Sequence, residues 1–412
     1  MPTALPTLRL DLEFLPSPLP DRPGLLVRDP LRYSEHTVII PPLLTRCLGL
    51  LDGVHTDIDL RELLFRLTGR LDIGDTIEQM VEALSRAGFL DDEPFRAMRA
   101  GRRQEFTDAP VRSAAHAGGG YPADEASLRD IMSGWMSNGG SPPGEAGPPG
   151  RVVAIAAPHV TPSGAPATYA AAYGALPMQD EAAAARTFVV LGTSHYGAPG
   201  KFGLTRKPFQ TPLGVAATDV ALVDTLAAAD PDGFAAEDYC HAVEHSIEFQ
   251  ILFLQNRFGP TVRILPILCG PLFARRPEDD LHVARALGAL GELNARHGDR
   301  LTWVLGVDMA HMGRRYGDDW RARAHEGAMV EVAARERARL DRIVAGDADG
   351  FWDLVQADDG GDADPLKWCG AAPIYSFLRA VPEVRGDVLA YDHWNIDDDS
   401  VVSFAALSFT RP

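Results

Sequence analysis

After residue 150 the chain alternates between short apolar runs and stretches with a helical pattern. Four runs rich in β-branched residues predict buried strands at 152–157, 187–192, 262–268 and 302–308. Helical stretches are predicted at 164–176, 218–229 and 280–296. Continuous apolar strands that alternate with helices are typical of a sheet covered on both faces. The pattern predicts an α/β domain over 151–412, with a mixed, partly parallel central sheet flanked by helices.

Two late apolar runs, 387–395 and 400–410, predict an antiparallel pair of strands at one edge of that sheet. No internal repeat is visible along the chain.

Residues 1–105 predict a separate small module. Leu60, Leu63, Leu64 and Leu67 form one helical stripe, and Ile77, Met80, Val81 and Leu84 form a second. An earlier stretch joins a short strand to a third helix. Three short helices with strand-like edges resemble a winged-helix module of the kind that binds peptides in some peptide-modifying systems. A plain helical cap on the main domain explains the pattern equally well.

The stretch 106–150 predicts a linker between the two parts. Ten of the nineteen residues from 132 to 150 are glycine or proline, and this segment shows neither a helical nor a strand period. The residues before it are mixed and polar, with room for one short helix.

Composition narrows the class of protein. The 412 residues include 39 basic and 57 acidic side chains, a formal net charge of −18, which disfavours unspecific binding to nucleic acid or to anionic membranes. The start of the chain lacks the pattern of a signal peptide, and no apolar run is long enough to span a bilayer. Four widely spaced cysteines do not suggest a disulfide framework. A cytoplasmic protein without nucleic-acid or membrane partners is expected.

Candidate chemistry lies just beyond the predicted strands. His159, His195 and His311 each follow a strand, and Asp308 stands three residues before His311. Ligands of open α/β sheets bind outside the carboxyl ends of the strands, so these imidazoles are expected to meet at one point if the strands are parallel neighbours. Each histidine alone would be an ordinary hydrogen-bonded turn residue. Asp308 is either a metal ligand or a group that orients His311.

Cys369 precedes Gly370 and an apolar helix with Pro373 in its first turn. A helix N-terminus favours the thiolate, which is both a nucleophile and a soft metal ligand. The alternative is a small buried residue, which is also the prediction for Cys47 and Cys269.

Within the stretch 240–259, residues 244–255 predict an amphipathic helix with Glu244 and His245 on its first turn. Its buried stripe would consist of Ile247, Ile251, Leu254 and Phe258. Glu244 and His245 are either acid/base groups facing a site or solvated cap residues. Cys240, His241 and His245 lack a second pair at zinc-finger spacing, so a structural zinc is not predicted.

Seven motifs over about 150–410 resemble the Memo family, whose microbial members are called AmmeMemoRadiSam system protein B. In order they are APHVTPSG, VVLGTSHYG, FQTPLG, EHSIEFQ, ILPILCG, GVDMAHMG and CGAAPI. The first 130 residues lie outside the usual family core. The resemblance implies a fold like that of type III extradiol ring-cleaving dioxygenases, which use non-haem iron.

The resemblance places the metal site on His159, His195 and Cys369, with Asp308 and His311 beside it. One departure is that the family's first motif usually has an aromatic residue after the histidine, where this chain reads PHVTPSG. Two histidines and one thiolate suit iron and copper alike. Iron is the expected metal, with copper as the alternative.

Two functions are expected from these observations. The first is a non-haem iron or copper oxidoreductase that works with a radical-SAM enzyme and a companion protein of the same system. The second is a metal-holding partner without turnover, whose N-terminal module binds a peptide or protein. A metal-free hydrolase with Cys369 as the nucleophile is a third, less favoured class.

Overall fold

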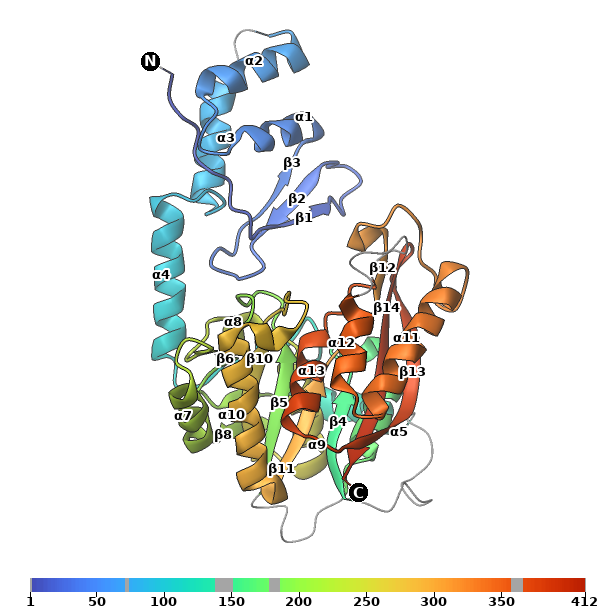
Figure 1. The fold of residues 1–412 in the computed structure, drawn as a ribbon. Helices are drawn as coiled ribbons and strands as arrows, with labels where there is room; N and C mark the ends of the chain where they lie inside the picture. Colours follow the sequence, from blue (N-terminus) through green and yellow to red (C-terminus); the bar gives the residue numbers. More distant parts are fainter. Residues whose placement is uncertain (1, 71–73, 138–150, 178–185, 357–365, 412) are drawn as a thin grey trace. The chain divides into compact units, whose positions relative to one another are not determined.

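The computed structural model describes five stretches of the chain: residues 2–70, 74–137, 151–177, 186–356 and 366–411. The chain divides into two compact units, Met1–Ala109 and Pro110–Pro412. Figure 1 shows the chain coloured from its N-terminus to its C-terminus.

The first unit contains a small antiparallel sheet followed by helices. Its strands are β1 (Glu13–Pro16), β2 (Leu25–Arg28) and β3 (Thr37–Ile40), paired in the order β1-β2-β3. Its helices are α1 (Pro42–Thr45), the 3₁₀ turn η1 (Arg46–Leu50), α2 (Asp57–Thr68), α3 (Gly74–Arg86) and α4 (Glu93–Asp108). The helices predicted from the two apolar stripes, α2 and α3, are present. The strands β1 and β2 and the long helix α4 were not predicted.

Local sequence signals explain the bounds of α2. Thr56 and Asp59 form a reciprocal capping box, in which the backbone N–H of Thr56 donates to the Asp59 carboxylate at 2.7 Å. Gly69 ends the helix with a left-handed φ of 71°, a conformation that glycine adopts without strain. Leu60 and Leu64 pack into a core of this unit, and Cys47 is fully buried there as predicted.

The second unit is built around one large sheet. Its strands are β4 (Val152–Ala157), β5 (Thr187–Thr193), β6 (Phe202–Leu204), β7 (Phe209–Thr211), β8 (Gly214–Thr218), β9 (Phe234–Ala235), β10 (Arg263–Cys269), β11 (Leu301–Gly306), β12 (His311–Gly313), β13 (Arg385–Asp397) and β14 (Ser400–Thr410). Its helices are α5 (Glu125–Ser137), α6 (Pro166–Gly174), α7 (Val220–Ala229), α8 (Cys240–Val243), α9 (Glu248–Phe258), α10 (Leu281–His297), α11 (Ala328–Val344), α12 (Ala348–Gln356) and α13 (Ala371–Ala380).

The sheet runs in the order β12-β14-β4-β11-β5-β10-β6-β9, with β13 on β14 and the β7–β8 hairpin on β10. The central strands β4, β11, β5 and β10 are parallel to one another. β14 joins them antiparallel to β4, and β13 pairs with β14 along most of its length. The α/β class, the mixed and largely parallel sheet and the antiparallel C-terminal pair are therefore confirmed.

Two hydrophobic cores cover the two faces of the sheet. Alternate residues of β4 point to opposite sides, with Ala154 and Ala156 in one core and Ile155 and Ala157 in the other. The first core contains buried residues of α7, α10, α11, α12 and α13, and the second those of α5, α6 and α9. Figure 1 shows α10 and α13 lying along the sheet. This double cover explains why the central strands are apolar throughout.

The structure differs from the linker predicted over 106–150. Helix α4 continues to Asp108, and the second unit begins at Pro110. Helix α5 packs into the second core through Leu128, Met132 and Trp135. The glycine- and proline-rich residues 138–150 lie outside the described residues.

Candidate metal centre

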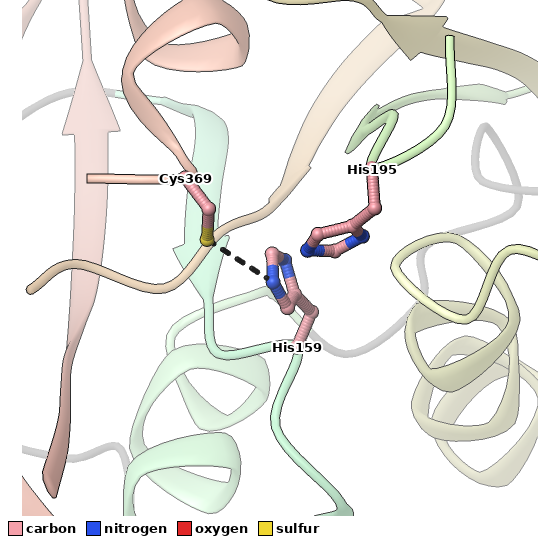
Figure 2. A group of neighbouring side chains, drawn as sticks. All are labelled: His159, His195 and Cys369. Carbon is pink, nitrogen blue, oxygen red and sulfur yellow. Dashed lines mark hydrogen bonds between the residues drawn. The ribbon is translucent and has the colours of Figure 1, made fainter. Parts of the chain in front are cut away.

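Three neighbouring parallel strands have their carboxyl ends at the same edge of the sheet. β11 lies between β4 and β5 and pairs in parallel with both. His159 and His195 each follow two residues after the end of β4 and β5. Figure 2 shows their imidazoles close together, with the Cys369 sulfur beside them. One ligand atom from each of these three residues lies within 4.8 Å of the others. The sheet topology therefore brings the two histidines together, and Cys369, which precedes the cap of α13, completes the group of three predicted ligands.

His159 is held by contacts that leave one ring nitrogen for a ligand. Its Nδ1 lies 2.9 Å from the carbonyl oxygen of Gly306, the last residue of β11, and must donate because that oxygen only accepts. Its Nε2 is 3.3 Å from the Cys369 Sγ and 3.4 Å from an Asp308 oxygen. The side chain is 2% exposed. His159 thus presents Nε2 to the centre from a dry position.

Asp308 fixes the backbone that carries His159. Its Oδ1 accepts the backbone N–H of His159 at 2.8 Å and that of Val160 at 3.3 Å. Among the described residues, Asp308 belongs to no group of three whose ligand atoms all lie within 4.8 Å of one another. Of the two roles left open by the sequence, the geometry favours orientation, and the side chain that it orients is His159 rather than His311.

Cys369 reaches the centre from the start of a helix, as predicted. Gly370 caps α13, and its backbone N–H donates to the carbonyl oxygen of Asp308 at 3.1 Å. The Cys369 Sγ lies 3.7 Å from the same oxygen. On the β5 side, the Thr193 hydroxyl donates to the Cys369 carbonyl oxygen at 3.3 Å. The thiol is therefore anchored to the ends of two strands.

His195 is oriented by Glu244. Both carboxylate oxygens lie 3.1 Å from the His195 Nδ1, and one of them also accepts the His195 backbone N–H at 2.9 Å. A carboxylate partner at Nδ1 leaves Nε2 of the imidazole for a metal. Glu244 also accepts the backbone N–H groups of His245 and Ser246. With a side chain only 1% exposed, Glu244 is a fully engaged buried carboxylate.

The position predicted for Glu244 and His245 on the first turn of a helix is wrong. Helix α8 ends at Val243 and α9 begins only at Glu248, so both residues lie in the connection between them. The Ser246 hydroxyl donates to the carbonyl oxygen of Thr193 at 2.8 Å and ties this connection to β5. The predicted amphipathic pattern is also wrong, because every residue from 248 to 255 is buried. The helix lies inside the domain.

His245 lies against both candidate ligands. Its ring is stacked on that of His195 at a centroid distance of 5.0 Å, and stands edge-on to that of His159 at 5.3 Å. Its Nδ1 is 3.1 Å from Glu244. His195, Glu244 and His245 form a second group with ligand atoms within 4.8 Å of one another.

His311 lies farther out than the sequence predicts. It is the first residue of β12, and its Nδ1 donates to the carbonyl oxygen of Met309 at 3.0 Å. It does not belong to the close group of ligand atoms formed by the described residues. Its ring packs edge-on against Tyr316 at 5.0 Å. It is near enough that its charge helps to lower the pKa of the Cys369 thiol.

The groups at the centre perturb one another's proton affinity. Burial opposes a charge on His159, but Asp308 and Cys369 outweigh it and raise the pKa of His159 to about 9. Burial also opposes a charge on His195, yet Glu244 raises the pKa of His195 well above its usual value. Because the His195 ring is still 27% exposed, water screens this attraction more than at His159.

The pKa of the Cys369 thiol is shifted downward, in contrast to the raised pKa values of His159 and His195. Burial would raise the pKa of Cys369, but His159 and His311 lower it well below the usual thiol value. At neutral pH, the Cys369 thiolate therefore faces the protonated ring of His159. Burial lowers the pKa of His245, against the attraction of Glu244, so that this ring is neutral.

Other histidines make no comparable centre. His241 is buried, and its Nε2 donates to the carbonyl oxygen of Gly203 at 3.0 Å. Neither His241 nor Cys240 belongs to a group of close ligand atoms among the described residues. A further group combines Asp230, Asp232 and His282, in which Asp230 accepts the His282 Nδ1–H at 2.9 Å, but this group contains neither a thiol nor a second imidazole.

The structure adds residues that the sequence reasoning missed. Arg112 and Glu248 form a buried ion pair next to Glu244, and Tyr121 and His116 contact the same network. All but Glu248 fall in the part of the chain that was predicted to be a linker. The segment 112–121 reads RSAAHAGGGY, so its single arginine, histidine and tyrosine are scattered among small residues and form no pattern that could have found them.

The fold and the centre define an α/β protein with a candidate His/Cys/Glu metal-binding group at the carboxyl ends of its parallel strands. The model of the family described as "Memo-like protein" matches residues 112–408. The chain belongs to the Memo family.

Several relatives are similar over most of this chain. A MEMO1 family protein of Aquifex aeolicus is 25% identical over 389 residues, which is 93% of this chain and 95% of that protein. One from Thermus thermophilus is 29% identical over 81% of this chain and 92% of its own length. One from Thermococcus kodakarensis is 30% identical over 73% of this chain and all of its own length.

The family match begins earlier than the resemblance in the sequence suggested. It starts at Arg112 instead of about residue 150 and so includes the segment with His116 and Tyr121. The similarity to the Aquifex aeolicus protein extends into the first unit as well, because 389 residues exceed the length of the second unit. Among the described residues, no helix is long and apolar enough to cross a membrane.

Proposed function

We propose that the second unit binds a redox-active metal ion, iron with copper as the alternative, through His159, His195 and Cys369, and acts as an oxidoreductase. The observation that carries the proposal is the approach of three ligand atoms within 4.8 Å, two from residues that follow β4 and β5 and one from the residue before the cap of α13. The donor set fits a metal. The carbonyl of Gly306 and the carboxylate of Glu244 occupy Nδ1 of the two imidazoles, and the third donor is a thiolate.

The bound metal would supply one-electron redox chemistry, and a soft thiolate beside two imidazoles is compatible with iron and with copper(I). The chain's own residues handle protons around it. His245 is a neutral imidazole next to both ligands, and Glu244 links it to His195. His311, the first residue of β12, lies near Cys369. Asp308 keeps His159 in place. A likeness of fold to ring-cleaving dioxygenases does not by itself define a substrate.

Metal analysis of the full-length protein, purified without oxygen, tests the proposal. The wild type should retain metal, and the Cys369→Ala/His195→Ala variant should lose most of it, because two of three donors are gone. His282→Ala is the matched control, since it removes a histidine from the separate Asp230–Asp232–His282 group. Equal metal content in the wild type and the double variant would refute the proposal.

The metal's identity and its sulfur ligand need a second measurement. X-ray absorption at the iron and copper edges identifies the element. A visible charge-transfer band from the thiolate should be present in the wild type and absent from Cys369→Ser. If the band persists without the sulfur, Cys369 is not a ligand.

The alternative is a metal-holding partner without turnover, which serves a radical-SAM enzyme and a companion protein of its system. The observation that favours it is the first unit, which has a core of its own and lies outside the family model. In this alternative the first unit, a winged-helix-like module, recognises a peptide or protein.

Removing residues 1–109 and measuring association with the radical-SAM enzyme and the companion protein encoded nearby tests this alternative. The deletion should stop before Arg112, because residues from Pro110 onward belong to the second unit. Unchanged association after the deletion would count against recognition by the first unit.

A further inference from the structure

A buried ion pair lies beside the candidate metal centre, outside the groups that could hold an ion. The Arg112 side chain is 1% exposed and that of Glu248 is not exposed. Taking both charges out of water costs free energy that their attraction often fails to recover, so such a pair is weak evidence for a role in stability alone. Its contacts indicate a different role.

Arg112 uses its guanidinium to hold the end of α8. Its Nε donates to the carbonyl oxygen of His241 at 2.7 Å, and its Nη2 donates to that of Glu244 at 2.7 Å. Its Nη1 donates to the carbonyl oxygen of Ser113 at 2.9 Å and to the Glu248 carboxylate. Lysine could not make this set of contacts, because it lacks the planar array of donors. The backbone of Glu244 is therefore pinned directly.

Glu248 holds the other end of the same connection, because it is the first residue of α9. Its carboxylate accepts the backbone N–H of Ala115 at 3.2 Å and that of His116 at 3.0 Å, together with the hydroxyl of Tyr121. The residues between α8 and α9, Glu244–Ile247, are thus fixed at their first residue by Arg112 and directly after their last by Glu248.

His116 also contacts the connection between α8 and α9. Its Nε2 donates to the carbonyl oxygen of Val243 at 2.8 Å, and its ring lies edge-on to His245 at a centroid distance of 5.6 Å. The residues from 112 to 121 therefore form a strap, defined here as Arg112–Tyr121, that sets the position of the connection carrying Glu244 and His245.

We infer that the Arg112–Glu248 ion pair positions the candidate ligand His195 through Glu244, so that the strap sets the metal affinity of the centre. The inference rests on the proposed function. Glu244 is the residue that Arg112 pins, and its two oxygens hold the Nδ1 and the backbone N–H of His195. Removing groups that orient a metal-binding histidine typically weakens metal binding 10- to 100-fold. Arg112 and Glu248 act one contact farther out and through the backbone.

The test compares cobalt(II) binding by full-length variants, with the visible spectrum reporting the coordination geometry. Arg112→Leu/Glu248→Leu removes both charges together, because a single removal would leave one buried charge unpaired. Because the pair acts one contact farther out, we expect cobalt(II) binding about 10-fold weaker than in the wild type, at the low end of that range, and a shifted spectrum. Glu248→Gln keeps the shape and an acceptor oxygen of the side chain but leaves the Arg112 charge unpaired, and in a folded sample it should shift both readouts in the same direction.

Arg257→Leu is the matched control. Arg257 lies on the same helix as Glu248, roughly 14 Å along the axis, and its guanidinium donates to the carbonyl oxygen of Leu176. It should lower the melting temperature without changing the cobalt affinity or spectrum. Wild-type affinity and spectrum in the double variant, or in a folded Glu248→Gln, would overturn the inference. Equal cobalt binding by the wild type and Cys369→Ala would instead overturn the proposed function.

Discussion

Metal affinity of the centre should rise steeply with pH between 7 and 9. A pKa of about 9 means that, at pH 7, the protonated form of His159 exceeds the neutral form about 100-fold. A metal that takes this nitrogen must displace the proton, which costs about 2.7 kcal/mol at pH 7. Each displaced proton therefore makes the apparent affinity about 10-fold stronger per pH unit up to pH 9.

The other two donors, His195 and Cys369, determine how steeply the metal affinity rises with pH. The pKa of His195 is also raised, so a metal that binds its Nε2 must displace a second proton, and the rise of affinity with pH becomes steeper. Cys369 releases no proton there, because its pKa is depressed and it is already a thiolate. An imidazole with its usual pKa of 6.5 would be neutral by pH 7.5, and affinity would then level off.

Zinc(II) is a suitable probe because it has no redox chemistry. Competition with a chelating indicator at pH 7, 8 and 9 gives the affinity, and calorimetry in two buffers with different ionisation enthalpies counts the released protons. Asp308→Asn should give a shallower slope, since it removes the charge that raises the pKa of His159 while the amide oxygen still accepts the backbone N–H. Affinity that stays flat from pH 7.5 to 9 without proton release would refute the reasoning.

Three further predictions concern stability. Gly306→Ala should lower the free energy of unfolding in urea by about 1–3 kcal/mol, because the new Cβ would lie 2.2 Å from the carbonyl oxygen of Ser246; wild-type stability would show that the backbone yields easily. Phe253→Ala should cost about 3–5 kcal/mol in the same assay, since its buried ring is stacked on Tyr169 at 4.3 Å, and a loss under 1 kcal/mol would contradict this packing. Burial lowers the pKa of His393 to about 4. The unfolded chain therefore binds a proton that the folded chain does not bind, and the free energy of unfolding should fall as pH drops from 6.5 toward 4. An equal decrease in His393→Gln would assign the effect to other groups.

Much of the fold could be predicted because its signals are local. The strand predicted at 152–157 is β4 with the same bounds, and the helix predicted at 280–296 is α10 (Leu281–His297). Buried parallel strands must be apolar on both faces, so they stand out in any window of the sequence. The wrong prediction of an amphipathic pattern for α9 also comes from reading only local signals. Its interior position makes polar residues such as Glu248 and Gln250 part of the core, which a periodic pattern cannot reveal.

The sequence by itself determined which side chains leave the strand ends: His159 after β4, His195 after β5 and Cys369 before α13. Strand ends and helix starts depend on neighbouring residues, and the topology of parallel strands then brings such ends together. Their role as metal ligands stays a prediction.

Only the tertiary structure decided what holds these side chains in place. Glu244 orients His195 from 49 positions away, and Arg112 pairs with Glu248 across 136. Asp308 is directed at His159 instead of His311, because β11 lies beside β4 in the sheet. Partners of a buried charge are set by which distant segments share the interior, and no local pattern encodes that.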